Sequence, residues 1–289
     1  MPQSWIIAGG ACLATILVLV VWRCRASRRT QGCTAQTALH GLISAASIVT
    51  LMGLWWLVTT LHLVEPLFMP SPETVAKTFH HVLFQGYRGT TLLEHLGYSM
   101  YRVLTGFGLA VATAVPLGLI MGRNAILRAV VDPLIEMYRP LPPLAYYTLL
   151  IVWLGIGDTS KIALLYLAAF PPIYISTMTA VRQVPISRIE CARCLGISGW
   201  PLLRRVIFPS ALPGIFIGLR VSIGFTYTTL VSSEIVAAVN GIGWLVLDAG
   251  RFLRTDLIFV GIITMGATGL LLDRLIRIME TLVVPWKEE

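Results

Sequence analysis

The sequence predicts an all-α integral membrane protein. Of its 289 residues, 56% are hydrophobic and only 12% are charged, whereas an ordinary globular domain carries about a quarter charged residues. Apolar runs close to the ~20 residues that a helix needs to cross the hydrocarbon core recur along the chain. A soluble core does not require such runs, so we expect lipid to solvate much of the surface.

Seven apolar runs are candidate transmembrane helices. They cover residues 6–22, 43–62, 101–121, 131–154, 162–180, 214–236 and 257–272. The run at 6–22 is predicted to be a retained N-terminal anchor, because no basic residue precedes it and arginines rather than a small-residue cleavage site follow. The other six are expected to form the working unit. Prolines break the run at 131–154 between residues 139 and 143, so that backbone must be buried in protein or line a wet cavity.

Basic residues predict the orientation in the membrane. Short cytoplasmic loops are rich in Lys and Arg, and these residues gather at 23–42, 123–128, 182–205 and 274–287. The N-terminus is therefore predicted to be periplasmic and the C-terminus cytoplasmic. This distribution explains the formal charge of +8 without a nucleic-acid partner.

One external segment has the chemistry of a helix start. Ser71, Pro72 and Glu73 supply a capping hydroxyl, a preset φ and an acid near the positive end of the helix dipole. We expect a short surface helix from Pro72 to about Phe84.

The sequence offers no constellation for enzyme chemistry. The segment 155–161 is the nearest approach to a phosphate-binding loop, and it lacks both the glycine before Lys161 and a hydroxyl residue after it. Neither a Gly-x-Ser-x-Gly elbow nor a His-Glu-x-x-His pair is present. Cys191 and Cys194 have the spacing of metal ligands but lack further ligands. We expect no catalytic residue, no metal site and no cofactor bound by this chain.

The loop from Arg182 to Leu212 is long for a connection between packed helices. It predicts a helix from about Ile186 to Leu195, a left-handed end at Gly196, and a second helix with Ser198 as its cap. An amphipathic hairpin of this kind is expected to dock on a partner.

This loop resembles the cytoplasmic loop of permease subunits of binding-protein-dependent ATP-binding-cassette importers. Their pattern is Glu-Ala-Ala, three residues, Gly, nine residues, Ile-x-Leu-Pro. The spacing is kept throughout, with Cys191 replacing the middle alanine. The matching positions are Glu190, Ala192, Gly196, Val206, Phe208 and Pro209. By this resemblance the hairpin is the coupling loop that contacts a cytoplasmic ATPase subunit.

Further segments resemble the taurine, alkanesulfonate and nitrate branch of these permeases, closest to the taurine permeases. They lie at 66–72, 139–145, 153–161, 211–213 and 218–220. The resemblance covers about 44–286 and implies a type I importer permease fold with six core spans, to which the anchor is an addition. It divides the chain into the anchor and basic linker (1–42), the first core span and periplasmic loop (43–96), the transmembrane core (97–280, with coupling loop 182–212) and a cytoplasmic tail (281–289).

The resemblance also implies the partners. These are two copies of a cytoplasmic ATP-binding subunit, which carry ATP and Mg, a periplasmic substrate-binding protein, a second permease copy and the lipid bilayer of the inner membrane. The expected cargo is taurine or a related alkanesulfonate. The alternative is an ion-gradient-driven secondary transporter of a small organic anion, which would need acidic residues within the membrane.

Three charged residues within the apolar runs are candidates for the translocation pathway. Glu136 and Arg139 lie three residues apart, so they either pair on one helix face or leave Arg139 facing the pathway, where a cation would favour a sulfonate. Glu234 either lines the pathway or ties neighbouring helices together.

Overall fold

The computed structural model describes residues 33–286, and the predicted anchor at 6–22 lies outside this range. The described residues divide into two compact units, with the boundary at Pro72. The first unit contains α2 (Cys33–Thr60), which includes most of the predicted run at 43–62. Within this unit the Trp55 indole donates to the Pro70 carbonyl at 3.2 Å.

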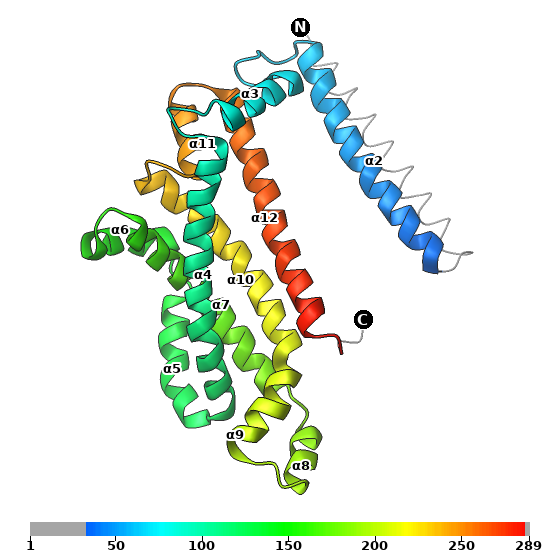
Figure 1. Ribbon diagram of the computed structural model, residues 1–289, viewed down its shortest axis with the longest axis vertical. Coiled ribbons are helices and arrows are strands. Elements are labelled where there is room, and N and C mark those ends of the chain that lie inside the picture. Colours follow the sequence, from blue (N-terminus) through cyan, green and yellow to red (C-terminus); the bar gives the residue numbers. More distant parts are fainter. Residues whose placement is uncertain (1–32, 287–289) are drawn as a thin grey trace. The chain divides into compact units, whose positions relative to one another are not determined.

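The second unit is a bundle of helices without a β-strand among its described residues (Figure 1). Its helices are α3 (Pro72–Phe84), α4 (Leu92–Arg123), α5 (Ala125–Tyr138), α6 (Pro143–Leu154), α7 (Asp158–Arg182), α8 (Ile186–Cys194), α9 (Gly199–Leu202), α10 (Phe208–Ala237), α11 (Ile242–Arg251) and α12 (Thr255–Val283). A π-helical turn, η1 (Leu203–Ile207), joins α9 to α10. The surface helix predicted from Pro72 to Phe84 is confirmed as α3.

Four helices of the described chain are long and apolar enough to cross a membrane. They are α4, α7, the continuous stretch 199–237 and α12. The break predicted between residues 139 and 143 of the run at 131–154 is confirmed, because α5 ends at Tyr138 and α6 begins at Pro143. Pro140 and Pro142 cause this break, since neither can donate the amide proton that a continuous helix needs. The count of six core spans stays a prediction.

Small residues allow α4 and α7 to pack closely along most of their length. Gly106, Ala110, Ala114, Gly118 and Gly122 recur every fourth residue on the α4 face that meets α7. A Cβ at Gly118 would lie 2.7 Å from the Thr177 Cβ, closer than real side chains approach. This small-residue spacing is typical of helix contacts in membranes, where close backbone approach replaces the hydrophobic driving force.

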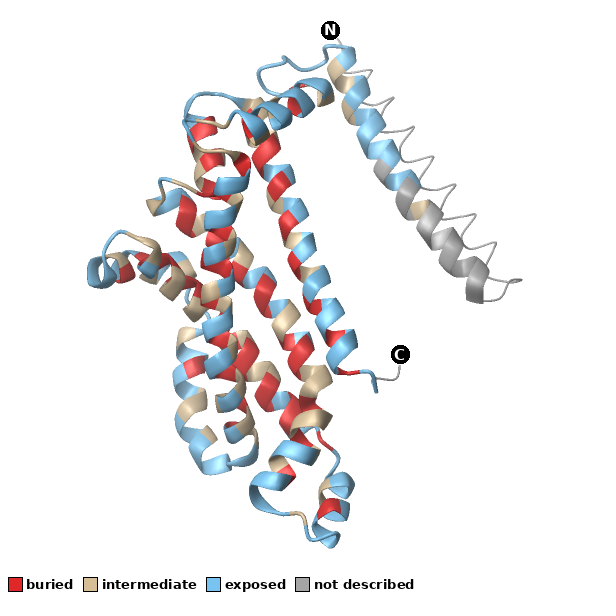
Figure 2. Ribbon diagram, in the orientation of Figure 1, coloured by how far each residue is buried: buried red, intermediate tan, exposed pale blue. Residues whose placement is uncertain are grey.

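The hairpin of α8 and α9 and the helix α11 lie at opposite ends of the bundle. In Figure 1, α8 and α9 project beyond the ends of α7 and α10, whereas α11 lies at the opposite end of the bundle. Buried side chains concentrate where α4, α7 and α10 face each other, and the tip of the projecting hairpin is largely exposed (Figure 2).

Candidate functional site

The projecting hairpin is built by a glycine that ends its first helix. Gly196 has φ +78°. Its amide donates to the Arg193 carbonyl at 2.9 Å, and the Ile197 amide donates to the Ala192 carbonyl at 3.0 Å. These two bonds form a Schellman motif, which satisfies carbonyls that the end of α8 leaves free. The predicted left-handed end at Gly196 is therefore confirmed.

The hairpin has a packed inner face and an exposed apolar tip. Ala192, Leu202 and Ile207 are buried in one cluster with residues at the adjoining ends of α7 and α10. At the tip, Leu195 is 80% exposed and Trp200 is 69% exposed. Large apolar side chains gathered at an exposed turn mark an interaction surface rather than a solvated connector.

The motif positions divide between these two faces. Glu190 is exposed, Val206, Phe208 and Pro209 are half-buried, and Ala192 is buried. Ser198 stands at the N-cap of α9 but makes no capping hydrogen bond with its side chain, so its predicted capping role is wrong. The second helix starts from the glycine-rich turn and continues through η1 directly into α10.

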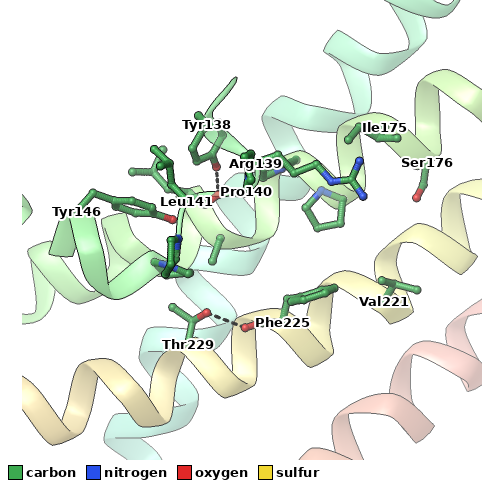
Figure 3. Close-up of a pocket in the computed structure, with 16 residues that line it drawn as sticks. Tyr138, Arg139, Pro140, Leu141, Tyr146, Ile175, Ser176, Val221, Phe225 and Thr229 are labelled. Atoms are coloured by element: carbon green, nitrogen blue, oxygen red, sulfur yellow. Dashed lines mark hydrogen bonds between the residues drawn. The ribbon is translucent and has the colours of Figure 1, made fainter. Parts of the chain in front are cut away.

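A pocket of about 400 Å³ opens beside the broken segment between α5 and α6 (Figure 3). Its walls come from residues 138–146, from the proline-containing middle of α7, and from α10. Arg139 is exposed there, and no carboxylate lines the pocket. Glu136 is exposed outside it. No ion pair joins Glu136 to Arg139 in the described chain, so the structure does not bring these two candidates together as a pair.

Glu234 lies apart from this pocket, in a buried polar network. Its Oε1 atom is 2.8 Å from the Arg102 Nη1 atom and accepts from the Ser99 hydroxyl at 2.8 Å. Its Oε2 atom accepts from the Gly243 amide at 2.8 Å. Glu234 is fully buried and Arg102 is 1% exposed. The carboxylate thereby links α4, α10 and the start of α11.

Arg102 extends the same network to α7. Its Nε atom is 2.8 Å from Asp158, at the start of α7, and its Nη1 atom donates to the Asn240 carbonyl at 3.0 Å. The Arg102 side chain also bonds the Asn240 side chain. Lys161 lies 3.7 Å from Asp158, so the network balances two cations with two carboxylates, as buried charges require.

The outer end of α11 carries a second polar cluster, outside the long spans. Arg88 pairs with Asp248 at 3.0 Å and its guanidinium stacks over the Phe252 ring at 4.6 Å. The Tyr87 hydroxyl donates to Asp248 at 2.9 Å. Burial, together with the hydrogen bond to the Asp248 carboxylate, raises the pKa of Tyr87. The cluster fixes the loop before α4 against α11.

Sequence reasoning missed several of these residues. Arg102 lies within the apolar run 101–121, where its charge signals a partner, but its partner Glu234 is 132 residues away. Asp158 lies in the segments 155–161 and 153–161 named above, but neither pattern predicts that it pairs with Arg102. Asn240 is uncharged and gave no signal. Only the packing of α4, α7 and α10 brings these side chains together.

The chain is similar to known transport proteins. Residues 114–285 match the family described as "Binding-protein-dependent transport system inner membrane component". The chain is 40% identical over 248 residues to the taurine transport system permease protein TauC of Escherichia coli, covering 86% of this chain and 90% of that protein. It is 33% identical over 249 residues to the putative aliphatic sulfonates transport permease protein SsuC of Bacillus subtilis, covering 86% and 88%.

The nitrate import permease protein NrtB of Synechocystis is 30% identical over 250 residues, covering 85% of this chain and 90% of that protein. Among solved structures, an inward-facing MetNI methionine ABC transporter matches with a TM-score of 0.57 at 20% identity, covering 68% of this chain and 96% of that one. At that identity the likeness shows the fold, which is the predicted type I importer permease fold.

These matches settle the family. The family match covers more than half of the chain, and the relatives cover most of it. Members are multi-pass proteins of the inner membrane that work with a separate ATP-binding subunit and a substrate-binding protein, so the secondary-transporter alternative has no support. The chain belongs to the binding-protein-dependent transport system inner membrane components, as the permease subunit of an ATP-driven importer.

Proposed function

We propose that this permease imports taurine or a related alkanesulfonate. The names of the relatives point to this class of cargo. Arg139, which has no ion-pair partner among the described residues, supports a cargo with an anionic group over one without. The periplasmic binding protein would deliver the sulfonate, and this chain would provide the passage across the membrane without covalent chemistry.

We assign coupling to ATP hydrolysis to the hairpin, because its tip is apolar and exposed. Leu195 and Trp200 stand exposed on a turn whose inner face is anchored to α7 and α10. A partner that moves the tip therefore also moves these two helices, because the hairpin continues into α10 without a loop. Glu190, Gly196 and Pro209 belong to this coupling element. ATP and Mg bind the partner subunit, and this chain holds no cofactor.

The assembly is proposed to contain two copies of this chain and two ATP-binding subunits, with the N-terminus periplasmic and the C-terminus cytoplasmic. Placing a second copy over the open side of the pocket would remove the Arg139 charge from lipid. ATP binding would then shift the pathway between two states. Inverting a 99:1 equilibrium requires about 5.5 kcal/mol of differential binding.

Of the three pathway candidates, only Arg139 is assigned to the pathway. Glu234 is assigned to the other role considered for it, that of tying helices together, because its contacts with Arg102, Ser99 and the Gly243 amide occupy both carboxylate oxygens. Glu136 is left as an exposed charge near the pathway entrance.

An uptake experiment tests the proposal. A strain that lacks its own sulfonate importers would receive this chain, its ATP-binding subunit and its binding protein, and each would be omitted in turn. Taurine uptake that needs all three supports the proposed function. Uptake that persists without the ATP-binding subunit and collapses with the proton gradient would overturn it.

A further inference from the structure

The pocket beside the α5–α6 break contains hydrogen-bond donors that have no acceptor. Arg139 and Ser176 both line it, and neither makes an ion pair or a side-chain hydrogen bond in the described chain. Of the other hydroxyl groups there, Thr229 donates to the Phe225 carbonyl at 2.8 Å and Tyr138 donates to the Leu167 carbonyl. The Tyr146 hydroxyl, which also lines the pocket, makes no hydrogen bond with the described residues. Donors without an internal acceptor in one pocket are available to water or to a bound molecule.

The charge of the pocket decides which kind of molecule can supply that acceptor. Arg139 is its one charged residue, and its sixteen lining residues include neither Asp nor Glu. A guanidinium presents two parallel N–H groups that match two oxygens of a sulfonate or carboxylate, whereas a cation would be repelled. The volume of about 400 Å³ lies within the range of small-molecule sites.

The depth of Arg139 explains why this charge cannot be an ordinary surface residue. The 14 residues of α5 span about 21 Å. In the proposed orientation, with the α4–α5 turn at the cytoplasmic membrane surface, Arg139 would lie within a hydrocarbon core about 30 Å thick. An arginine exposed to lipid at that depth costs several kcal/mol by insertion scales. The irregular backbone at 139–142 would likewise be unsatisfied in lipid. Both observations require water or protein on the open side of the pocket.

Arg139 and Ser176 come from different helices and lie toward the same wall. Figure 3 shows the guanidinium extending toward Ile175 and Ser176, while Phe225 and Val221 of α10 form the opposite apolar wall. Ser176 is placed by close packing, since its Cβ lies against Gly218 of α10, where any larger residue would collide. The hydroxyl is therefore held at the α7–α10 contact that borders the pocket.

We propose that Arg139 and Ser176 form a binding subsite for the anionic end of the transported molecule, with Arg139 contacting two oxygens and Ser176 donating to a third. The inference rests on the proposed function, in which this pocket belongs to the pathway. The cargo class is a small organic anion with a planar or pyramidal face of oxygens, a sulfonate above all. The apolar wall at Phe225 then receives the carbon chain.

Transport by the complete complex tests the subsite. The permease, its ATP-binding subunit and its binding protein would be reconstituted in proteoliposomes with radiolabelled taurine, using Arg139→Gln, Arg139→Lys and Ser176→Ala. The matched control is Arg123→Gln, which removes an exposed arginine outside the pocket. Basal ATP hydrolysis and co-purification of the ATP-binding subunit would be measured on the same preparations.

We expect Arg139→Gln to lower taurine uptake by about tenfold or more, the factor for losing a charge-assisted hydrogen bond. Arg139→Lys should retain part of the uptake because it keeps the charge, and Ser176→Ala should lose less than Arg139→Gln. Assembly and basal hydrolysis should remain at the level of the Arg123→Gln control. Unchanged uptake by Arg139→Gln would overturn the subsite, and so would a parallel loss of assembly, which would give Arg139 a structural role.

The two proposals fail in different ways. If the unaltered complex imports nitrate and not taurine, the proposed cargo is wrong, while loss of nitrate uptake in Arg139→Gln would still support the anion subsite. If the unaltered complex imports taurine and Arg139→Gln does so equally well, only the subsite is wrong. Import only of solutes that carry no anionic group would overturn both.

Discussion

Replacing Glu234 with alanine should destabilise the permease more than any other single loss of a carboxylate in the described chain. The change removes both oxygens that hold the network together. Three buried donors then lose their acceptor: the Ser99 hydroxyl, the Gly243 amide and one N–H of Arg102. Arg102 keeps Asp158, which is 43% exposed and cannot replace a fully buried partner.

The magnitude follows from these contacts. Leaving a buried donor unsatisfied costs about 1–3 kcal/mol, and breaking a buried ion pair by removing one partner costs about 3–5 kcal/mol in total. We take the second range for Glu234→Ala, because the three donors share one site and their costs are not additive. At about 2–4 °C per kcal/mol for a domain of this size, the thermal midpoint should fall by about 10 °C.

The assay is the loss of monodisperse permease after heating in detergent, followed by size-exclusion chromatography. The matched control is Asp273→Ala, which removes a half-exposed carboxylate 3.1 Å from Arg220. An exposed pair of that kind contributes about 0–1 kcal/mol, so the control should shift the midpoint by only a few degrees.

A double variant distinguishes loss of the ion pair from loss of packing volume. Combining Arg102→Met with Glu234→Met removes one charge of each sign and leaves Asp158 beside Lys161, 3.7 Å apart. The double variant should be more stable than either single variant, because no buried charge then lacks a partner. If Glu234→Ala shifted the midpoint no more than Asp273→Ala, or if the two methionine changes were simply additive, the buried-network reasoning would be refuted.

Three further outcomes are expected. Gly196→Ala should weaken retention of the ATP-binding subunit on affinity resin, because a left-handed φ of +78° costs a non-glycine residue about 1–2 kcal/mol. Gly196→Asn should weaken it less. Equal retention of both variants and the parent would argue against a structured turn. Trp200→Asp should reduce that retention without changing the thermal midpoint, since the side chain is 69% exposed; retention at the parental level would exclude the tip as the contact. Gly118→Val should lower stability by about 1–3 kcal/mol, because the new side chain would collide with Thr177. Gly108→Ala, with open space around it, should be neutral or slightly stabilising. Similar thermal midpoints for the two variants would contradict the close α4–α7 packing.

Helix starts and ends could be predicted from the sequence where residues adjacent in the chain determine them. The start of α3 at Pro72 and the end of α8 before Gly196 follow from a capping residue, a proline and a glycine acting within one turn of helix. The prolines at 140 and 142 predicted a break, but they did not show that the two halves would part into separate helices. That outcome depends on what packs against each half.

The buried network of Arg102 and Glu234 could not be predicted from the sequence, because it also depends on how the helices pack. Arg102 and Glu234 each sit in an apolar run, and a lone charge in such a run indicates only that some partner exists. Identifying the partner requires knowing that α4 and α10 pass each other at this level. Ser99 and Asn240 gave no signal, because small polar residues occur throughout membrane helices.

Two arginines in the apolar runs therefore show why a charge cannot be assigned a role from its position in the chain alone. Arg102 has carboxylate, amide and carbonyl partners and is 1% exposed, so its guanidinium holds the helices of the bundle together. Arg139 has none of these and is exposed in a pocket without an acid. The N–H groups of a paired arginine are already hydrogen-bonded, whereas those of an unpaired arginine can form charge-assisted hydrogen bonds with an anion. The lack of a partner among the described residues is thus what makes Arg139, and not Arg102, the residue suited to a transported sulfonate.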